Sequence, residues 1–290
     1  MLDNYLLEEL VTFAQTGTLA KTASQLNVTQ PTVTRGMQKL ETDWGVRLFD
    51  RQPNRITLTA TGKLAAREAT TLLQAQHEAI AKVQNYDRNQ RILTIGSTIP
   101  GPRMLINHVA PTISTPIKID QTLITADDPT ALLTDNTYSL LFSSQSLQTS
   151  TVTSSYLGNE RLSINLNRFM YQANQSSITF NELKNLSFLV LTDIGPWRAV
   201  IQHAIPNAKF LYQEQREAFE EISKYADFPY FSSNLSNSDS QFPKPTPEDG
   251  RVRIPISDEQ AHIAVYATYL RSNTAAVTPI ITTLTEAWPD

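Results

Sequence analysis

Residues 29–41 read Thr-Gln-Pro-Thr-Val-Thr-Arg-Gly-Met-Gln-Lys-Leu-Glu, and this stretch decides the fold of the N-terminal part of the chain. Its apolar side chains recur at helical spacing and are Val33, Met37 and Leu40. Thr29 is suited to cap such a helix, whose first turn tolerates proline. The opposite face would carry Pro31, Thr34, Arg35 and Gln38. A short helix with this polar face is typical of DNA recognition helices.

The segments before and after residues 29–41 have the patterns of further helices and of a pair of strands. Asn4–Gln15 has the apolar spacing of a helix that ends at Gly17, and Thr18 is placed to cap a second helix. Residues 48–59 are basic and read as strand, turn and strand. Residues 1–59 are therefore predicted to form a winged helix-turn-helix DNA-binding domain, in which helices make the core.

Charge is distributed unevenly along the 290 residues. The net charge is −4, yet residues 29–63 hold six basic against three acidic residues. A local basic face is sufficient for nucleic-acid binding. The absence of cysteine excludes disulfides and thiolate chemistry and fits a reducing cytosol. Because the start is acidic and no apolar run nears the roughly 18 residues of a membrane span, we expect a cytoplasmic protein without membrane contact.

Residues 60–88 are predicted to form one long linker helix. Its apolar and small side chains alternate in steps of four and three, at Ala65, Ala69, Leu72, Gln76, Ala79 and Val83. A helix of this length extends about 43 Å and needs a partner for its apolar side. The side chains could belong to the core of their own domain, but the length of the seam favours a homodimer.

Strand and helix patterns alternate through residues 89–290, which predicts an α/β domain of two lobes. The first lobe would hold residues 89–160 and 262–290, since the last helical pattern follows a returning strand at His262–Leu270. The second lobe would hold residues 161–261. Ligands commonly bind at the carboxyl ends of such strands, so the crevice between the lobes is the expected binding site.

With these residues in view, the chain resembles the LysR-type bacterial transcriptional regulators over its full length, most strongly at residues 5–63. The resemblance rests on Phe13, Thr18, Ala20, Ala23 and Leu26, on residues 29–35, and on the motifs at 48–51 and 58–62. It implies a two-lobed domain like those of periplasmic binding proteins, a small-molecule effector in its cleft, and dimers or tetramers. Two features depart from the family: Gly36 replaces a better helix former, and Lys224–Ser233 lacks a glycine-rich turn.

Seven residues are candidates for DNA contact. The set consists of Gln30, Pro31, Thr34, Arg35, Gln38, Arg51 and Arg55. By similarity Gln30 would reach a base edge, where an amide can pair with adenine, while Arg35 can bind guanine or phosphate. Arg51 and Arg55 on the wing would meet phosphates or the minor groove. Arg51 has an alternative structural role, which is pairing with Asp50 or Glu41.

Seven further residues follow strands of the two lobes and are candidates for effector binding. The set consists of Ser97, Thr98, Ser143, Ser144, Thr192, Asp193 and Arg198. Hydroxyls and N–H groups at such loops can hold a polar ligand, although each residue alone could equally cap a turn. Arg198 could pair with an anionic effector or with a neighbouring carboxylate.

Motifs for other chemistry are missing from the sequence. The four histidines have no ligand spacing, and no nucleophile elbow, phosphate-binding loop or dinucleotide fingerprint occurs. We therefore expect no metal, no cofactor and no catalytic residues. The sequence favours an effector-modulated, homo-oligomeric DNA-binding regulator. Two alternatives stay open: a regulator that binds DNA without an effector, and a cytoplasmic small-molecule-binding protein without DNA function.

Overall fold

The computed structural model describes residues 3–52, 55–125, 128–239, 242–243 and 250–289. The chain divides into two compact units, Met1–Gln84 and Asn85–Asp290. Each unit has its own hydrophobic core. We therefore describe the units one at a time.

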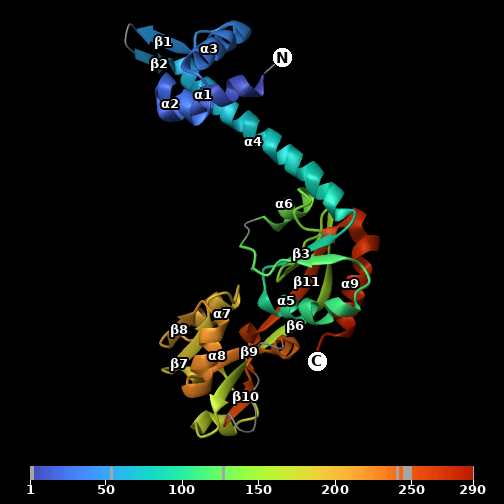
Figure 1. Ribbon diagram of the computed structural model, residues 1–290. Coiled ribbons are helices and arrows are strands. Elements are labelled where there is room, and N and C mark those ends of the chain that lie inside the picture. Colours follow the sequence, from blue (N-terminus) through green and yellow to red (C-terminus); the bar gives the residue numbers. More distant parts are fainter. Residues whose placement is uncertain (1–2, 53–54, 126–127, 240–241, 244–249, 290) are drawn as a thin grey trace. The chain divides into compact units, whose positions relative to one another are not determined.

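Three short helices open the first unit, and they are α1 (Asn4–Thr16), α2 (Leu19–Gln25) and α3 (Gln30–Trp44) (Figure 1). Their ends follow the local chemistry. The Thr18 and Thr29 hydroxyls accept hydrogen bonds from the first turns of α2 and α3. Gly17 and Gly45 end α1 and α3 in the left-handed conformation, which glycine adopts without a steric penalty.

A two-stranded antiparallel wing follows α3, with strands β1 (Phe49–Gln52) and β2 (Arg55–Leu58). The ring of Phe49 packs edge-on against Phe13 of α1, at 5.5 Å between centroids, so the wing is fixed to the helical core. The next helix, α4 (Ala60–Asn89), begins in this core with Ala65, Ala66 and Ala69 buried. Within the described residues, no helix combines the length and apolarity needed to cross a membrane.

Nine strands form one sheet in the described part of the second unit, in the order β4-β3-β5-β11-β6-β9-β7-β8, with β10 also paired with β6. The strands are β3 (Leu93–Ser97), β4 (Ile117–Ile119), β5 (Leu140–Ser143), β6 (Val152–Asn167), β7 (Ser187–Leu191), β8 (Lys209–Gln213), β9 (Tyr230–Ser233), β10 (Arg251–Pro255) and β11 (His262–Leu270). Pairing is parallel around β3 and β7 and antiparallel along β6. The long strand β6 belongs to both halves of the sheet, which makes two lobes.

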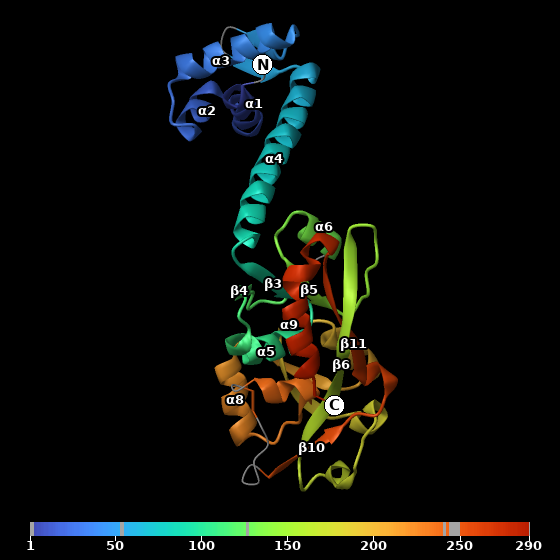
Figure 2. The same ribbon diagram turned by 90° about the vertical axis from the view of Figure 1, so that its right-hand side faces the viewer.

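Helices cover both faces of each lobe. They are α5 (Pro100–Val109), α6 (Pro129–Thr134), α7 (Trp197–Ala204), α8 (Arg216–Tyr225) and α9 (Thr274–Glu286). In the first lobe α5 and α9 pack together against the sheet, as Figure 2 shows, and α6 has a separate core. In the second lobe α7 and α8 contribute to different apolar clusters. Short 3-10 helices occur at η1 (Ala110–Thr112), η2 (Tyr171–Asn174), η3 (Phe180–Leu183), η4 (Asn234–Ser238), η6 (Glu259–Ala261) and η7 (Arg271–Asn273).

The predicted fold class is confirmed, including the wing, the linker helix and the α/β character of the second half. Two strand assignments were incomplete. The sequence pattern started a strand near Arg161, whereas β6 begins at Val152, and it did not identify β10. The predicted division between lobes at residues 160 and 161 therefore falls inside a continuous strand. The exact domain boundaries stay predictions.

Candidate functional site

The outward face of α3 and the wing surround a shallow hollow in the first unit. It is lined by Gln30 and Thr34 of α3, by Arg51, Gln52, Arg55 and Ile56 of the wing, and by residues 17–20 at the start of α2. The buried face of α3 holds Val33, Met37 and Leu40 in the core. Because a helix buries one face, the polar face is left to solvent, and Pro31, Arg35 and Gln38 are exposed on it. Of the seven residues predicted for DNA contact, the structure thus brings Gln30, Thr34, Arg51 and Arg55 together at one hollow, while the other three are exposed on α3.

The side chain of Arg51, on the wing, forms an ion pair with Glu41. Arg51 Nη2 lies 3.0 Å from Oε2 of Glu41 near the end of α3. The other oxygen of Glu41 accepts hydrogen bonds from the backbone N–H groups of Leu48 and Phe49, at 2.8 and 2.9 Å. Glu41 therefore fixes the start of the wing to α3, and Arg51 takes part in that link. This is the structural role considered above as the alternative to phosphate contact.

The exposed part of α4 carries a row of apolar side chains interrupted by Gln76, whose side-chain oxygen accepts a hydrogen bond from the Asn4 amide. Ala65 and Ala69, the first two residues of the predicted seam, are buried in the core of their own unit, so they do not face a partner helix. Beyond them Leu72 is 46% exposed and Val83 is 71% exposed. Gln76 and Ala79 lie between them and are also exposed. The seam is thus confined to the later turns of the helix.

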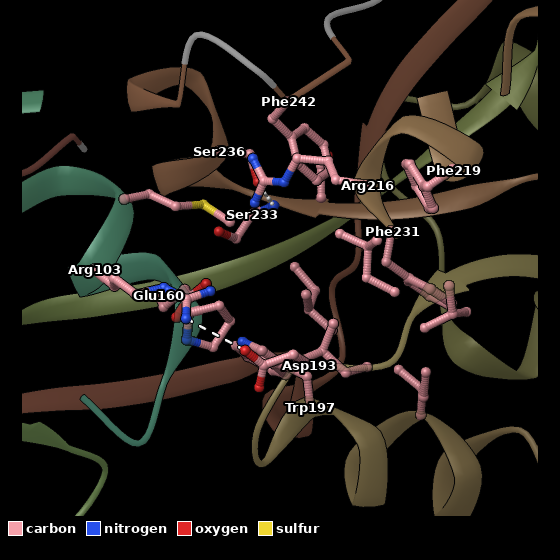
Figure 3. A pocket seen from close by; sticks show the side chains of 18 of the residues that line it. Arg103, Glu160, Asp193, Trp197, Arg216, Phe219, Phe231, Ser233, Ser236 and Phe242 are labelled. Atoms are coloured by element: carbon pink, nitrogen blue, oxygen red, sulfur yellow. Dashed lines mark hydrogen bonds and ion pairs between the residues drawn. The ribbon is translucent and has the colours of Figure 1, made fainter. Parts of the chain in front are cut away.

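A pocket opens between the lobes of the second unit, beside the carboxyl ends of the parallel strands β3 and β7 (Figure 3). Helix α5 follows β3 and contributes Pro100, Arg103 and Met104, while the second lobe supplies most of the apolar wall. The cavity volume is about 70 Å³. Its lining is mainly apolar, as is typical of sites for small organic ligands.

Glu160 of β6 lies in this pocket and is 1% exposed. Burial raises the pKa of its carboxyl to about 7, although the Ser233 hydroxyl, the Trp197 indole N–H and the Gly101 N–H favour the charged form. Within the described residues, neither Glu160 Oε2 nor Trp197 Nε1 makes a hydrogen bond of acceptable geometry. A Cβ at Gly101 would lie 2.4 Å from the Glu160 Cδ atom, so the carboxyl group packs directly on the first turn of α5.

Two arginines at the opening of the pocket are paired with acids. Arg103 of α5 lies 3.3 Å from Asp193, which follows β7, so this ion pair joins the two lobes (Figure 3). Arg216 of α8 pairs with Asp239. A wider polar recess shares these side chains and adds Asn107, His108, Gln121 and Glu214. The opening is therefore polar, whereas the interior is mainly apolar.

The residues predicted for effector binding are mostly placed elsewhere, and only Asp193 lines the pocket. The hydroxyls of Ser97, Ser143 and Thr192 donate to the carbonyl oxygens of Ile99, Gln145 and Gln213, and Thr98 donates to that of Phe142. Ser144 is exposed outside the lining, and the Arg198 guanidinium lies 4.3 Å from the centroid of the Tyr212 ring. Ser97 and Ser143 thus act in local turns, as the alternative interpretation allowed, whereas Thr98 and Thr192 bond to the ends of neighbouring strands.

Sequence reasoning did not single out Glu160, Arg103 or Arg216. Arg103 and Arg216 lie on helices that the pattern indicated, whereas Glu160 lies in the part of β6 before the predicted start of the strand near Arg161. Side-chain direction relative to the other lobe cannot be read from a local pattern. One signal was present in the sequence. Glu160 directly precedes the alternating apolar run of β6, where an ionisable residue needs a specific environment.

The chain thus joins a winged helix-turn-helix, which is a DNA-binding fold, through a long helix to a two-lobed α/β domain. This combination defines a class of proteins that have a DNA-binding domain and a second α/β domain. Residues 5–63 match the family described as "Bacterial regulatory helix-turn-helix protein, lysR family". Residues 5–63 thus carry the helix-turn-helix domain of this family, which confirms the resemblance where it was strongest in the sequence.

A relative from a Pseudomonas species, named "SDS degradation transcriptional activation protein", is 34% identical over 102 residues, which are 34% of this chain and 33% of that protein. The matched segment thus spans about a third of the relative. Among solved structures, the DNA complex of DarR from Vibrio fischeri has a TM-score of 0.60 at 16% identity, covering 98% of this chain and 99% of that one. A full-length OxyR variant from Pseudomonas aeruginosa has a TM-score of 0.50 at 20% identity, covering 99% and 94%. These likenesses show that the chain shares its fold with those proteins over nearly its whole length.

Proposed function

We propose that this protein is a sequence-specific, DNA-binding transcriptional regulator that binds double-stranded operator DNA as a homo-oligomer and responds to a small effector. The observation that carries the proposal is the common surface of α3 and the wing, where Gln30, Thr34 and Arg55 line one hollow. An amide and a guanidinium on such a face can pair with base edges and phosphates. The DNA-bound state of DarR, which shares this fold, supports the same use of the surface.

The rest of the proposal concerns assembly and control. The exposed row on α4 provides an apolar surface for a second copy of the chain, which favours a dimer and allows a tetramer. A regulator that has lost its effector should have a cleft filled by its own side chains, whereas a cavity of about 70 Å³ and an adjoining polar recess of about 620 Å³ remain between the lobes. An effector that binds one arrangement of the lobes better than another would shift the population of DNA-binding states.

The proposal also covers catalysis and the location of the protein in the cell. The relatives are transcriptional regulators, and we propose that this chain likewise catalyses no reaction. We also place it in the cytoplasm, where operator DNA is accessible to it. If the protein bound only a small ligand and no DNA, the exposed polar face of α3 would have no function.

The test is fluorescence anisotropy of DNA from the intergenic region beside the gene, titrated with wild type and with Arg35→Ala across a salt series. We expect specific binding that weakens steeply with salt and that the substitution weakens by about 1 to 3 kcal/mol. Arg91→Ala is the control, because Arg91 is exposed and pairs with Asp87 in the second unit. Equal affinity of wild type and Arg35→Ala for specific DNA would contradict the assigned recognition face.

A further inference from the structure

The pocket between the lobes has an apolar interior with one ionisable group at its inner end. Leu162, Leu189 and Phe231 contribute to the wall, and the ring of Trp197 lies beside Glu160 in Figure 3. A ligand in this space must have a compact apolar body to replace the water there. The polar group of the ligand must be able to pair with the carboxyl group of Glu160.

Glu160 offers an oxygen that the surrounding donors, which are the Ser233 hydroxyl and the Trp197 and Gly101 N–H groups, do not fully satisfy. Its Oε2 atom makes no hydrogen bond within the described residues, although the side chain is 1% exposed. Buried polar atoms are rarely left in this state, because the lost hydration is not compensated. An N–H group from a ligand would satisfy this oxygen, and a positive charge on that group would form a charge-assisted hydrogen bond.

The basic groups of the cleft are not arranged for an anion. Arg103 and Arg216 are each paired with an aspartate, as described above. The combined lining of pocket and recess contains these two arginines against four acids, which are Glu160, Asp193, Glu214 and Asp239. The local charge therefore favours a cationic ligand over a carboxylate.

The N-terminus of α5 is also closed to an anion. Helix N-termini bind carboxylates and phosphates through their free N–H groups. In α5, however, Pro100 and Pro102 have no N–H group, and the N–H of Gly101 faces the Glu160 carboxyl. The protein's own carboxylate thus occupies the place where an anionic ligand would bind.

We propose that this pocket binds a small organic ammonium compound, with its apolar body against Leu162, Leu189 and Phe231 and its N–H group donating to Oε2 of Glu160. The proposal rests on the proposed function, because it names the chemical class of the effector. The faces of the aromatic rings in the wall attract the same positive charge. Glu160 is then both the packing partner of α5 and the counter-ion of the ligand.

The test compares three probes of similar shape, 2-phenylethylammonium, 2-phenylethanol and 3-phenylpropionate, by isothermal titration calorimetry of the full-length protein at about pH 8, where Glu160 is mostly ionised. We expect the ammonium to bind wild type at least about tenfold more tightly than the other two probes. Glu160→Gln keeps the shape and an acceptor oxygen but removes the charge, so it should abolish this preference without weakening 2-phenylethanol. Glu221→Gln makes the same change at an exposed position of α8 outside the linings of pocket and recess, and should leave the preference intact.

Three results would overturn the inference: no heat with the ammonium probe, a carboxylate probe that binds as tightly, or a preference that survives in Glu160→Gln. These measurements contain no DNA, so they are independent of the anisotropy experiment. If the protein binds operator DNA but prefers 3-phenylpropionate, the inference about the ligand is wrong and the proposed function stands. If the protein binds the ammonium probe but not operator DNA, the proposed function is wrong and the inference about the chemistry of the pocket stands.

Discussion

Glu9 and Glu160 are buried glutamates, one in each unit, and burial raises the pKa of each to about 7. Glu9 of α1 is 0% exposed and lies against α3 at Gly36. A Cβ at that position would lie 1.7 Å from Glu9 Oε2. The glycine that departs from the family pattern thus leaves room for the Glu9 carboxyl group packed on it.

The packing of Glu9 on α3 predicts the effect of Gly36→Ala. Alanine favours a helix over glycine by about 1 kcal/mol, but here the clash should reverse the sign and destabilise the unit by about 1 to 3 kcal/mol. Hydrogen exchange of the α3 amides, read by mass spectrometry, measures this change. In the double variant Glu9→Ala/Gly36→Ala the clash is absent, so protection should recover. Greater protection in Gly36→Ala alone would show that Glu9 does not restrict the position.

The raised pKa of Glu160 predicts a pH dependence of stability. Below about pH 4.5 the carboxyl is neutral in both the folded and the unfolded chain. Between about 4.5 and 7 the unfolded chain loses the proton first, so the free energy of unfolding should fall by up to about 3 kcal/mol. Glu160→Gln should remove this part of the pH dependence in urea unfolding experiments. Identical pH profiles for the two proteins would mean that the buried carboxyl does not titrate as assigned.

At the scale of elements, α3 and the wing act as one piece because Glu41 bonds to both. The helix provides the base-reading face, and its end holds the start of β1. Of the two wing arginines, Arg51 takes part in this link, whereas Arg55 lies at the start of β2 and is exposed. The two should therefore contribute differently to DNA binding.

The prediction is that Arg55→Ala reduces the slope of log affinity against log salt by about one, because a phosphate contact is lost. Arg51→Ala should reduce the slope less, since its charge is already balanced by Glu41. Anisotropy titrations of both variants over the same salt range decide between them. A larger loss of slope in Arg51→Ala would assign the phosphate contact to Arg51.

At the scale of the whole molecule, continuity of two elements connects the parts of the chain. Strand β6 runs through both lobes, and the Arg103–Asp193 ion pair joins the lobes across the pocket. Helix α4 continues from the first unit into the second, where the side-chain amides of Asn85 and Asn89 donate to the carbonyl oxygens of Asp135 and Asn136. A ligand in the pocket and a partner on α4 therefore act on connected elements.

The exposed row on α4 predicts that Val83→Asp shifts the assembly toward monomer, because a charge would be buried at the seam. Light scattering after size-exclusion chromatography measures the mass. Ala81→Asp introduces the same charge on the other side of the helix and should leave the mass unchanged. An unchanged mass in Val83→Asp would place the interface of the oligomer elsewhere.

The sequence by itself determined the local elements of the DNA-binding unit. Caps at Thr18 and Thr29, Gly17 at the end of α1 and the spacing of Val33, Met37 and Leu40 act over a few residues, so they were readable and are confirmed. The same reasoning found the alternation of strands and helices in the second unit and the long helix α4. It could not tell that the first two positions of the seam, Ala65 and Ala69, are buried in their own unit.

The tertiary structure alone decided the pocket. Ser97, Ser143 and Thr192 follow strands as expected, yet their hydroxyls are used by neighbouring carbonyl groups. Glu160 and Arg103, which are far apart in sequence, line the same pocket. The physical reason is range: caps and periodicity act within a few residues, whereas a pocket depends on how two lobes joined by β6 face each other.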